Sequence, residues 1–350
     1  MKTKSTSQTP RTRSKNAILL AITALALCAW PIVALAADCP NKGVTVWTGA
    51  VDHNWFNPGN WTNGIPTCND IVSSTAGINN GGTAQINYPN AFACDVTLGA
   101  NATDSGNLSV AGSGGNLTTC RDISVGYQGK GSLSITNGGV VTTDTGASIA
   151  WGATSTTSSN GAVTVKGTNS TWAVGLELDI GGTTNAAGGT GLLTVTSSAT
   201  VTAASVHVWN SGTLTGNSTV STTNGMTVDG TISPNGGGGT LTFGGGLSFS
   251  GLATTQCKVT PQDPSATPQV SVSAQVSLGG RLSVTMTGDF SSAPTRFTLL
   301  HAASVDFVHR TFDSQSITYP TGQGCWIPQI TYDYSGGHVS VYLDRVINCN

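Results

Sequence analysis

The chain has 350 residues, only 9% of them charged, and its formal net charge is −2 from 14 basic and 16 acidic residues. This composition excludes a coiled coil, which needs abundant Glu, Lys and Leu, and a nucleic-acid binder held by a basic surface. Hydrophobic residues make up 38% of the chain and recur regularly, which also excludes a charge-driven disordered protein.

The first 36 residues have the pattern of a secretory signal peptide. A basic region ends at Lys15, an apolar run covers 17–29, and residues 34–36 supply the small side chains that signal peptidase accepts. The apolar run is too short for a membrane span of about 20 residues, and Pro31 follows it closely. We therefore expect a secreted or cell-surface protein, bacterial in origin, with no integral membrane span after signal removal.

Cysteine usage agrees with export. Seven cysteines remain after the signal: Cys39, Cys68, Cys94, Cys120, Cys257, Cys325 and Cys349. No CxxC or Cys/His spacing indicates zinc, so disulfides in an oxidising compartment are the better interpretation. Cys39/Cys68, Cys94/Cys120 and Cys325/Cys349 are sequential pairs of similar separation, which leaves Cys257 over, although sequence alone leaves the connectivity open.

One of these pairs has a specific structural argument. Cys94 and Cys120 lie just before Val96 and Ile123, which begin equivalent expected strands. Because the separation of the two cysteines matches one repeat, we expect their side chains to stack and to form a disulfide.

The middle of the chain repeats with a period of roughly 26–29 residues. The anchors of the repeat are Gly126, Gly152, Gly181 and Trp209. Runs at 132–135, 162–165 and 192–195 follow the first three anchors and alternate apolar with small polar residues, as a strand with one buried face does.

Short strands at a nearly constant period predict an all-β fold, a right-handed parallel β-solenoid (β-helix) with N- and C-terminal caps. Stacked coils share a core that one coil cannot bury alone. A β-sandwich is the alternative, but it does not require the same unit at a constant period. Two interior columns are expected, one of Ile123, Ile149, Leu178 and Val206 and the next of Val125, Trp151, Ile180 and Val208.

Four regions are expected after the signal. A Trp-rich cap covers 37–90, where Trp47, Trp55 and Trp61 would close the open end of the solenoid. The solenoid repeats occupy 91–255, a Pro-containing linker 256–268, and the C-terminal coils and cap 269–350.

Several segments resemble a known group of repeat proteins. Residues 128–139, QGKGSLSITNGG, are similar to the GxGxLxITNGG unit of autotransporter passengers and PEP-CTERM-associated surface proteins, and 167–172 resemble their GxxSTW element. The tryptophan-rich head at 47–66 and the segment 278–300 resemble the opening and the last coils of such passengers. The resemblance implies an exported β-solenoid surface protein that lacks the β-barrel and the PEP-CTERM tail.

Candidate catalytic residues are few. If the protein is an enzyme, Asp95, Asp122 and Glu177 are the candidates, because they precede equivalent strands and would stack in one column, interrupted at Ser148. Asp122 and Glu177 would lie two coils, or about 9.6 Å, apart, near the upper limit for an inverting glycosidase. The alternative is that these carboxylates accept hydrogen bonds from amides at the corners of the coils.

Other polar and aromatic residues carry weaker signals. Asp179 and His207 occupy matching outward positions of successive coils and would form a hydrogen-bonded surface pair. Trp151 and Trp172 are expected in the core. His301 and His309 have no third ligand nearby, and we expect no metal and no cofactor.

Two functions from different classes remain. The first is a non-catalytic exported solenoid with an adhesive or structural matrix role, contacting an extracellular surface, a glycan or further copies of itself. The second is a polysaccharide-active lyase or hydrolase on a β-helix. Charges that converge in a groove on one face would favour the enzyme, and scattered charges would favour adhesion. No nucleic-acid partner is expected.

Overall fold

The computed structural model describes residues 39, 43–69, 73–154, 157–234, 239–291, 293–321 and 326–347. The chain divides into two compact units, 1–35 and 36–350, and every described residue belongs to the second. The predicted signal peptide, Cys325 and Cys349 therefore lie outside the described residues. Among those described, no helix reaches the length and hydropathy that a membrane-spanning helix requires.

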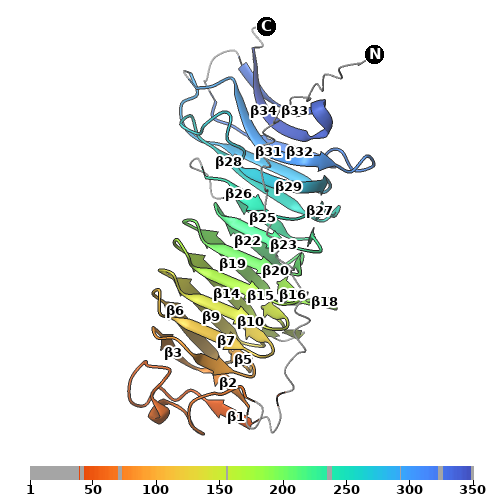
Figure 1. The fold of residues 1–350 in the computed structure, drawn as a ribbon. Helices are drawn as coiled ribbons and strands as arrows, with labels where there is room; N and C mark the ends of the chain where they lie inside the picture. The colour runs from red at the N-terminus through yellow and green to blue at the C-terminus, as the bar shows by residue number, and fades with distance from the viewer. Residues whose placement is uncertain are drawn as a thin grey trace, which may run out of the picture. The chain divides into compact units, whose positions relative to one another are not determined.

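Parallel strands stack in chain order around one apolar core and form a β-solenoid of about 9 turns (Figure 1). Most turns contribute one strand to each of three faces. Within the described residues the helical elements are two short 3-10 turns, η1 (Pro58–Asn60) and η2 (Ser335–Gly337). The predicted all-β solenoid is confirmed.

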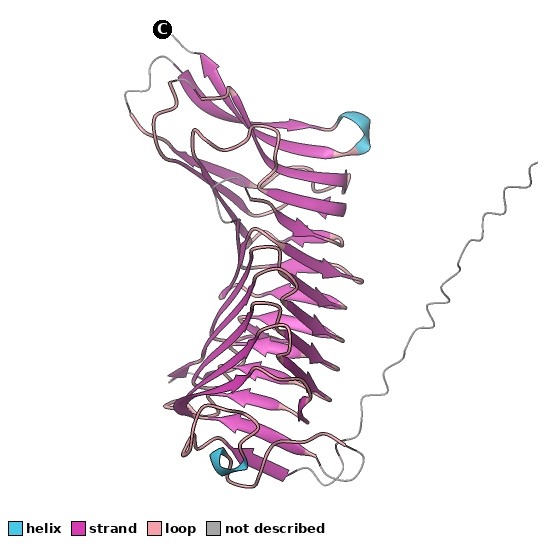
Figure 2. Ribbon diagram, turned by 60° about the vertical axis from the view of Figure 1, so that its left-hand side comes forward, coloured by secondary structure: helices cyan, strands magenta, loops and turns pink. Residues whose placement is uncertain are grey.

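The strands of face 1 pair in parallel with the equivalent strand of the next coil (Figure 2). They are β1 (Gly43–Val46), β2 (Ser74–Ile78), β5 (Val96–Leu98), β8 (Ile123–Val125), β11 (Ala147–Ile149), β16 (Glu177–Ile180), β21 (Ser205–Val208), β24 (Met226–Val228) and β27 (Leu247–Phe249).

Face 2 contains the longest regular ladder. Its strands are β3 (Asn80–Ile86), β6 (Ser105–Ala111), β9 (Lys130–Thr136), β14 (Asn160–Lys166), β19 (Thr190–Thr196), β22 (Gly212–Gly216), β25 (Thr231–Pro234), β28 (Thr254–Val259), β30 (Arg281–Met286) and β32 (Ser314–Thr318). Leu133, Val163 and Leu193 are paired in register and at most 1% exposed, as the alternation of their runs predicts.

Face 3 closes each coil. Its strands are β4 (Ala91–Ala93), β7 (Asn116–Thr119), β10 (Val140–Thr143), β15 (Thr171–Val174), β20 (Thr200–Ala203), β23 (Thr219–Thr222) and β26 (Leu241–Phe243). Trp172 of β15 is fully buried here, which confirms its expected place in the core.

The C-terminal end changes from parallel to antiparallel pairing. The long strands β29 (Val270–Ser277) and β31 (Arg296–Val305) each continue both face 3 and face 1. The last two strands, β33 (Trp326–Asp333) and β34 (Val339–Ile347), form an antiparallel hairpin against β31. The segment expected as a linker contains the end of β28, where Val259 pairs with Met286.

The three tryptophans of the N-terminal region pack against one another. Trp47 and Trp55 each contact Trp61 edge-to-face, with ring centroids 5.0 and 4.8 Å apart. All three are at most 4% exposed, and Trp61 donates its indole N–H to the carbonyl of Trp55. They form an apolar cluster at the first coil.

The predicted columns of face 1 are wrong at one coil. Ala147, not Ile149, pairs with Ile123 and Leu178, and Ile149 pairs with Val125 and Ile180. The alignment on Gly152 fails because Ala150 occupies the turn position in that coil, with a positive φ of 62°. Trp151 consequently follows the turn on the outside and is 41% exposed, so its expected place in the core is also wrong.

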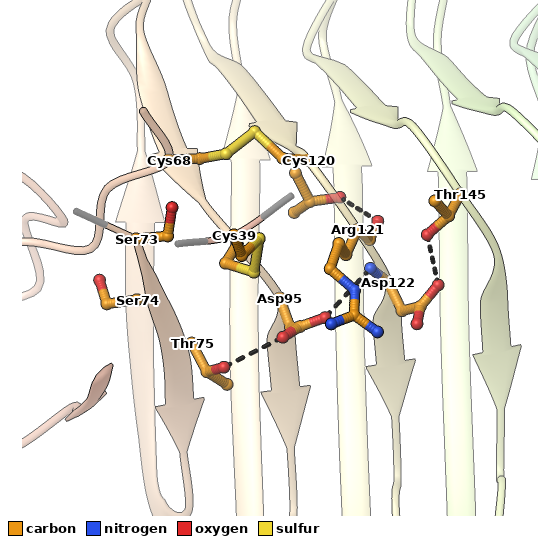
Figure 3. Close-up of a disulfide and its surroundings, with 12 residues drawn as sticks. Cys39, Cys68, Ser73, Ser74, Thr75, Asp95, Cys120, Arg121, Asp122 and Thr145 are labelled. Atoms are coloured by element: carbon orange, nitrogen blue, oxygen red, sulfur yellow. Dashed lines mark hydrogen bonds between the residues drawn. A yellow bond between two sulfur atoms is a disulfide. The ribbon is translucent and has the colours of Figure 1, made fainter. Parts of the chain in front are cut away.

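Two disulfides join the first coils, but their connectivity differs from the expected pairs. Cys39 bonds Cys94 and Cys68 bonds Cys120, with Cα–Cα distances of 6.1 and 6.3 Å (Figure 3). Ala93 and Thr119, the residues directly before Cys94 and Cys120, are paired in register, so the two cysteines do occupy equivalent positions of neighbouring strands. Cys94 is fully buried and Cys120 only partly, and each is bonded to a cysteine of the N-terminal region instead.

The remaining described cysteine, Cys257, is a free thiol on β28. It is 3% exposed and points into the core, where burial raises the pKa of the thiol to about 12. It therefore is not placed to link two copies of the chain.

Candidate functional site

The outer side of face 1 is where polar side chains converge. On β16, Leu178 and Ile180 point into the core, so the alternation of the strand turns Glu177 and Asp179 outward. On β21 the same alternation turns His207 outward, and the strand register places His207 beside Asp179. The predicted matching of these two positions is confirmed.

The expected hydrogen bond between Asp179 and His207 is replaced by two others. Trp209 donates its indole N–H to Oδ1 of Asp179 at 2.8 Å, and His207 Nε2 lies 2.7 Å from Oδ2 of Asp229. His207 also stacks on Trp209, with ring centroids 3.8 Å apart. Asp179 is therefore bonded to Trp209, which directly follows β21, and His207 to Asp229, which directly follows β24.

Asp179 lies in an unusual environment for a carboxyl group. It is only 3% exposed although it is on the outer side of the sheet. Burial raises the pKa of Asp179 to about 6, with a smaller upward contribution from the charge of Glu177, while the Trp209 hydrogen bond and the charge of His207 act in the opposite direction. Burial also acts to raise the pKa of Asp229, but hydrogen bonds from Ser250 and His207 lower it overall.

Two hollows lie over these residues. The Trp151 hollow has a volume of about 180 Å³ and is lined by Asp122, Ser124, Ser148, Trp151, Glu177 and Asp179, among others. The His207 hollow, of about 540 Å³, is lined among others by Glu177, His207, Thr227, Ser248, Asp306 and His309. Since they share Glu177, the two hollows adjoin, and together they are called the face 1 groove.

A short hairpin forms one wall of the Trp151 hollow. It consists of β17 (Gly182–Thr183) and β18 (Ala186–Ala187) and follows directly after β16. A second hairpin, β12 (Ala153–Thr154) and β13 (Thr157–Ser158), is inserted at the corresponding place in the preceding coil. These insertions are the reason why the coil length is uneven here, and they occur beside the carboxylate and histidine side chains.

Trp151 lines the groove, and the aromatic side chains of Tyr127 and Trp209 contact the lining residues Trp151 and Asp179. Tyr127 and Trp151 each lie two residues beyond paired strand ends, and their ring centroids are 5.2 Å apart. The next equivalent position is Gly182, whose missing Cβ would lie 2.5 Å from Cδ1 of Trp209. Glycine therefore leaves room for the Trp209 ring, which continues the aromatic row.

The candidate residues Asp95, Asp122 and Glu177 do not act as one set. They occupy equivalent positions of their coils, as predicted. In the coil between Asp122 and Glu177 the equivalent residue is Gly146, and not Ser148 as expected. Asp95 accepts hydrogen bonds from the Thr75 hydroxyl and, at 3.3 Å, from the backbone N–H of Asp122 (Figure 3), and Asp122 accepts from the backbone N–H of Gly146 at 3.0 Å. Both make the corner contacts of the alternative interpretation.

Asp122 and Glu177 nevertheless line the same hollow, whereas Asp95 is not among its lining residues. Within the described part of the chain, no hydrogen bond or ion pair to the carboxylate of Glu177 is found. Of the remaining histidines, His301 contacts Ser340, and His309 contacts Asp306 at the edge of the His207 hollow.

Sequence reasoning missed three residues that contact and orient side chains lining the groove. In the sequence, Trp209 was recognised only as the last of the four repeat anchors. Tyr127 directly follows the anchor Gly126, and Asp229 lies beyond the last anchor. Trp209 and Tyr127 could have been identified by one signal, an aromatic residue at the turn position that follows a face 1 strand or directly after it.

No protein-family model, curated protein or solved structure matches the chain.

Proposed function

We propose that the protein is an exported β-solenoid that adheres to glycans through the face 1 groove. The observation that carries this proposal is the aromatic row of Tyr127, Trp151 and Trp209 beside a floor of carboxylate and hydroxyl groups. The C–H faces of sugar rings pack on aromatic rings, and their hydroxyls hydrogen-bond to carboxylates and serines. The groove offers both kinds of contact side by side.

The dimensions of the groove favour an extended ligand. The strands that line it run from β8 to β29, six coil steps apart. At about 4.8 Å per step this is about 29 Å, which suits an oligosaccharide chain rather than a single small molecule. Repeated contacts along such a chain would add by avidity.

The charges of the groove favour a neutral glycan. Its described lining includes Asp122, Glu177, Asp179 and Asp306, and neither hollow is lined by Lys or Arg. A polyuronate would meet like charges without a compensating cation. Neutral hydroxyl-rich polymers therefore fit the lining better than pectate or alginate.

Export and surface location are part of the same proposal. Two disulfides are consistent with an extracytoplasmic protein. The signal-peptide pattern and the resemblance to autotransporter passengers and PEP-CTERM-associated proteins support secretion and a place on the cell surface or in a matrix. The solenoid fold is compatible with this resemblance.

Retention on insoluble polysaccharides tests the proposal. The purified protein should be retained on at least one of a set of neutral polymers, such as cellulose, chitin and β-1,3-glucan, and not on calcium-free polygalacturonate. Trp151→Ala should reduce retention at least tenfold. Tyr88→Ala removes an aromatic side chain that is 64% exposed and lies outside the groove, so it should leave retention unchanged. Equal retention of the two variants would contradict the proposal.

A polysaccharide hydrolase is the second candidate, because charges do converge on one face. Carboxylate oxygens of Glu177 and Asp179 lie within 4.8 Å of each other. Retaining glycosidases hold their two carboxyl groups about 5–5.5 Å apart, so this pair fits better than the predicted pair of Asp122 and Glu177. New reducing ends that disappear in Glu177→Gln would favour the hydrolase, and retention without cleavage would favour adhesion.

A further inference from the structure

We propose that Glu177, Asp179 and His207 form a binding site for one divalent transition-metal cation, best matched by Zn²⁺. One ligand atom from each of the three side chains lies within 4.8 Å of the other two. The three project to the outer side of face 1 from two adjacent strands, β16 and β21. The proposed metal site is a second property of the protein, and it does not depend on the proposed adhesion to glycans.

The histidine is oriented as a metal ligand would be. His207 Nε2 lies 2.7 Å from Oδ2 of Asp229, so this nitrogen carries the proton that the carboxylate accepts. The lone pair of Nδ1 is then available, and no other hydrogen bond to the ring is found among the described residues. A carboxylate on the second ring nitrogen is the usual companion of a metal-bound histidine.

The first carboxylate is held in a similar way. Trp209 donates to Oδ1 of Asp179 at 2.8 Å, whereas the sole partner of Oδ2 among the described residues is the Thr184 hydroxyl, at a long 3.4 Å. Oδ2 therefore keeps lone pairs for a cation. Two of the three ligands thus have a partner outside the set, and these partners fix their orientation before any ion binds.

The local charge balance supplies the energetic reason. Asp179 is 3% exposed, and a second carboxylate, that of Glu177, lies within 4.8 Å. Neither hollow beside them is lined by Lys or Arg within the described residues. Buried carboxylates are normally paired or coordinate a metal, and His207 is already engaged with Asp229. A divalent cation would neutralise both acidic groups at once.

The donor set selects the kind of ion. One imidazole nitrogen and two carboxylate oxygens suit Zn²⁺, which accepts three protein ligands and keeps a further position for water. Ca²⁺ prefers six to eight oxygen ligands and is bound poorly by imidazole. The hollows on either side leave the open position accessible from the groove.

Calorimetric titration of the purified protein, without a histidine tag, tests the site. ZnCl₂ should bind with a stoichiometry of one per chain, and CaCl₂ should bind at least 100-fold more weakly. Glu177→Gln should lower zinc affinity at least 100-fold, and Asp229→Asn, which removes only the orienting partner, should lower it about 10–100-fold. Asp289→Asn makes the same change of charge at an exposed position that lines neither hollow, and it should leave affinity unchanged.

The folded state of each variant is checked by far-UV circular dichroism. Glu177 is only partly buried and its carboxylate makes no hydrogen bond in the described structure, so Glu177→Gln should fold even if Asp179→Asn does not. Absence of a one-to-one zinc isotherm, or an isotherm that Glu177→Gln leaves unchanged, would overturn the proposal. Loss of glycan retention with intact zinc binding would contradict only the proposed adhesion.

Discussion

Trp209 donates its indole N–H to Oδ1 of Asp179, and this 2.8 Å hydrogen bond joins two successive coils on the outer side of face 1. The same ring stacks on His207 and fills the space above Gly182. One indole thus holds the floor of the groove together, which makes the pair Trp209 and Asp179 the clearest point for an energetic test.

A double-mutant cycle of Trp209→Phe and Asp179→Ala should give a coupling energy of about 1–3 kcal/mol at pH 8. The reason is that a hydrogen bond to a buried charged acceptor contributes more than one between neutral groups. Urea unfolding of the four proteins measures it. Trp209→Phe combined with Asp52→Ala, in the N-terminal region, should be additive, and a coupling near zero for the first pair would refute the role of this bond.

Removal of either disulfide should lower the free energy of unfolding by about 4 kcal/mol. The bridges enclose chain segments with sequence separations of 55 and 52 residues, and closing such loops restricts the unfolded chain. Cys39→Ser/Cys94→Ser and Cys68→Ser/Cys120→Ser are the two variants to compare by denaturant unfolding.

Peptide mapping without reduction checks the connectivity directly. The expected linked peptides contain Cys39 with Cys94 and Cys68 with Cys120. Recovery of a peptide that links Cys94 to Cys120 would contradict both of these pairings.

The buried thiol of Cys257 should make stability fall at high pH. Its pKa is about 12 in the folded protein, against 9.0 for an unperturbed thiol, because burial disfavours the thiolate. The folded state therefore keeps a proton that the unfolded state loses between pH 9 and 12. This contribution is complete below pH 9 and decreases by up to about 1.4 kcal/mol per pH unit above it.

Cys257→Ala provides the reference, since it lacks the thiol and retains the other titrating groups. The difference in unfolding free energy between wild type and Cys257→Ala should shrink by about 2 kcal/mol from pH 8 to 10.5. Urea unfolding under oxygen-free conditions measures it, and a constant difference would show that the thiol is not held in the core.

Gly126→Ala should destabilise the solenoid by about 2 kcal/mol more than Gly64→Ala. Both glycines have a positive φ, 74° and 78°, so both variants carry the cost of about 1–2 kcal/mol for a left-handed alanine. Only at Gly126 would the new Cβ also meet backbone, 2.3 Å from the carbonyl oxygen of Asn160. Thermal unfolding compares the two, and equal effects would contradict the close approach of these coils.

The amino-acid sequence alone determined the solenoid and the register of three strands of face 2, β9, β14 and β19. Leu133, Val163 and Leu193 follow one another at equal intervals, and they pair as this constant interval requires. Alternation of apolar and small polar residues is a local property that any single coil displays, so it can be recognised before the coils are stacked. The outward matching of Asp179 and His207 follows from the same alternation.

Only the tertiary structure decided the register of face 1 at Ile149, the disulfide connectivity and the partners within the groove. The step from Ile123 to Ala147 is shorter than the step from Ala147 to Leu178, because turns and inserted hairpins change the coil length without changing the strands. Cys94 and Cys120 occupy equivalent positions, yet each bonds a cysteine from an earlier segment of the chain, and their spacing does not show this. That Asp179 accepts from Trp209, and His207 contacts Asp229, depends on the packing of three successive coils, which no sequence spacing records.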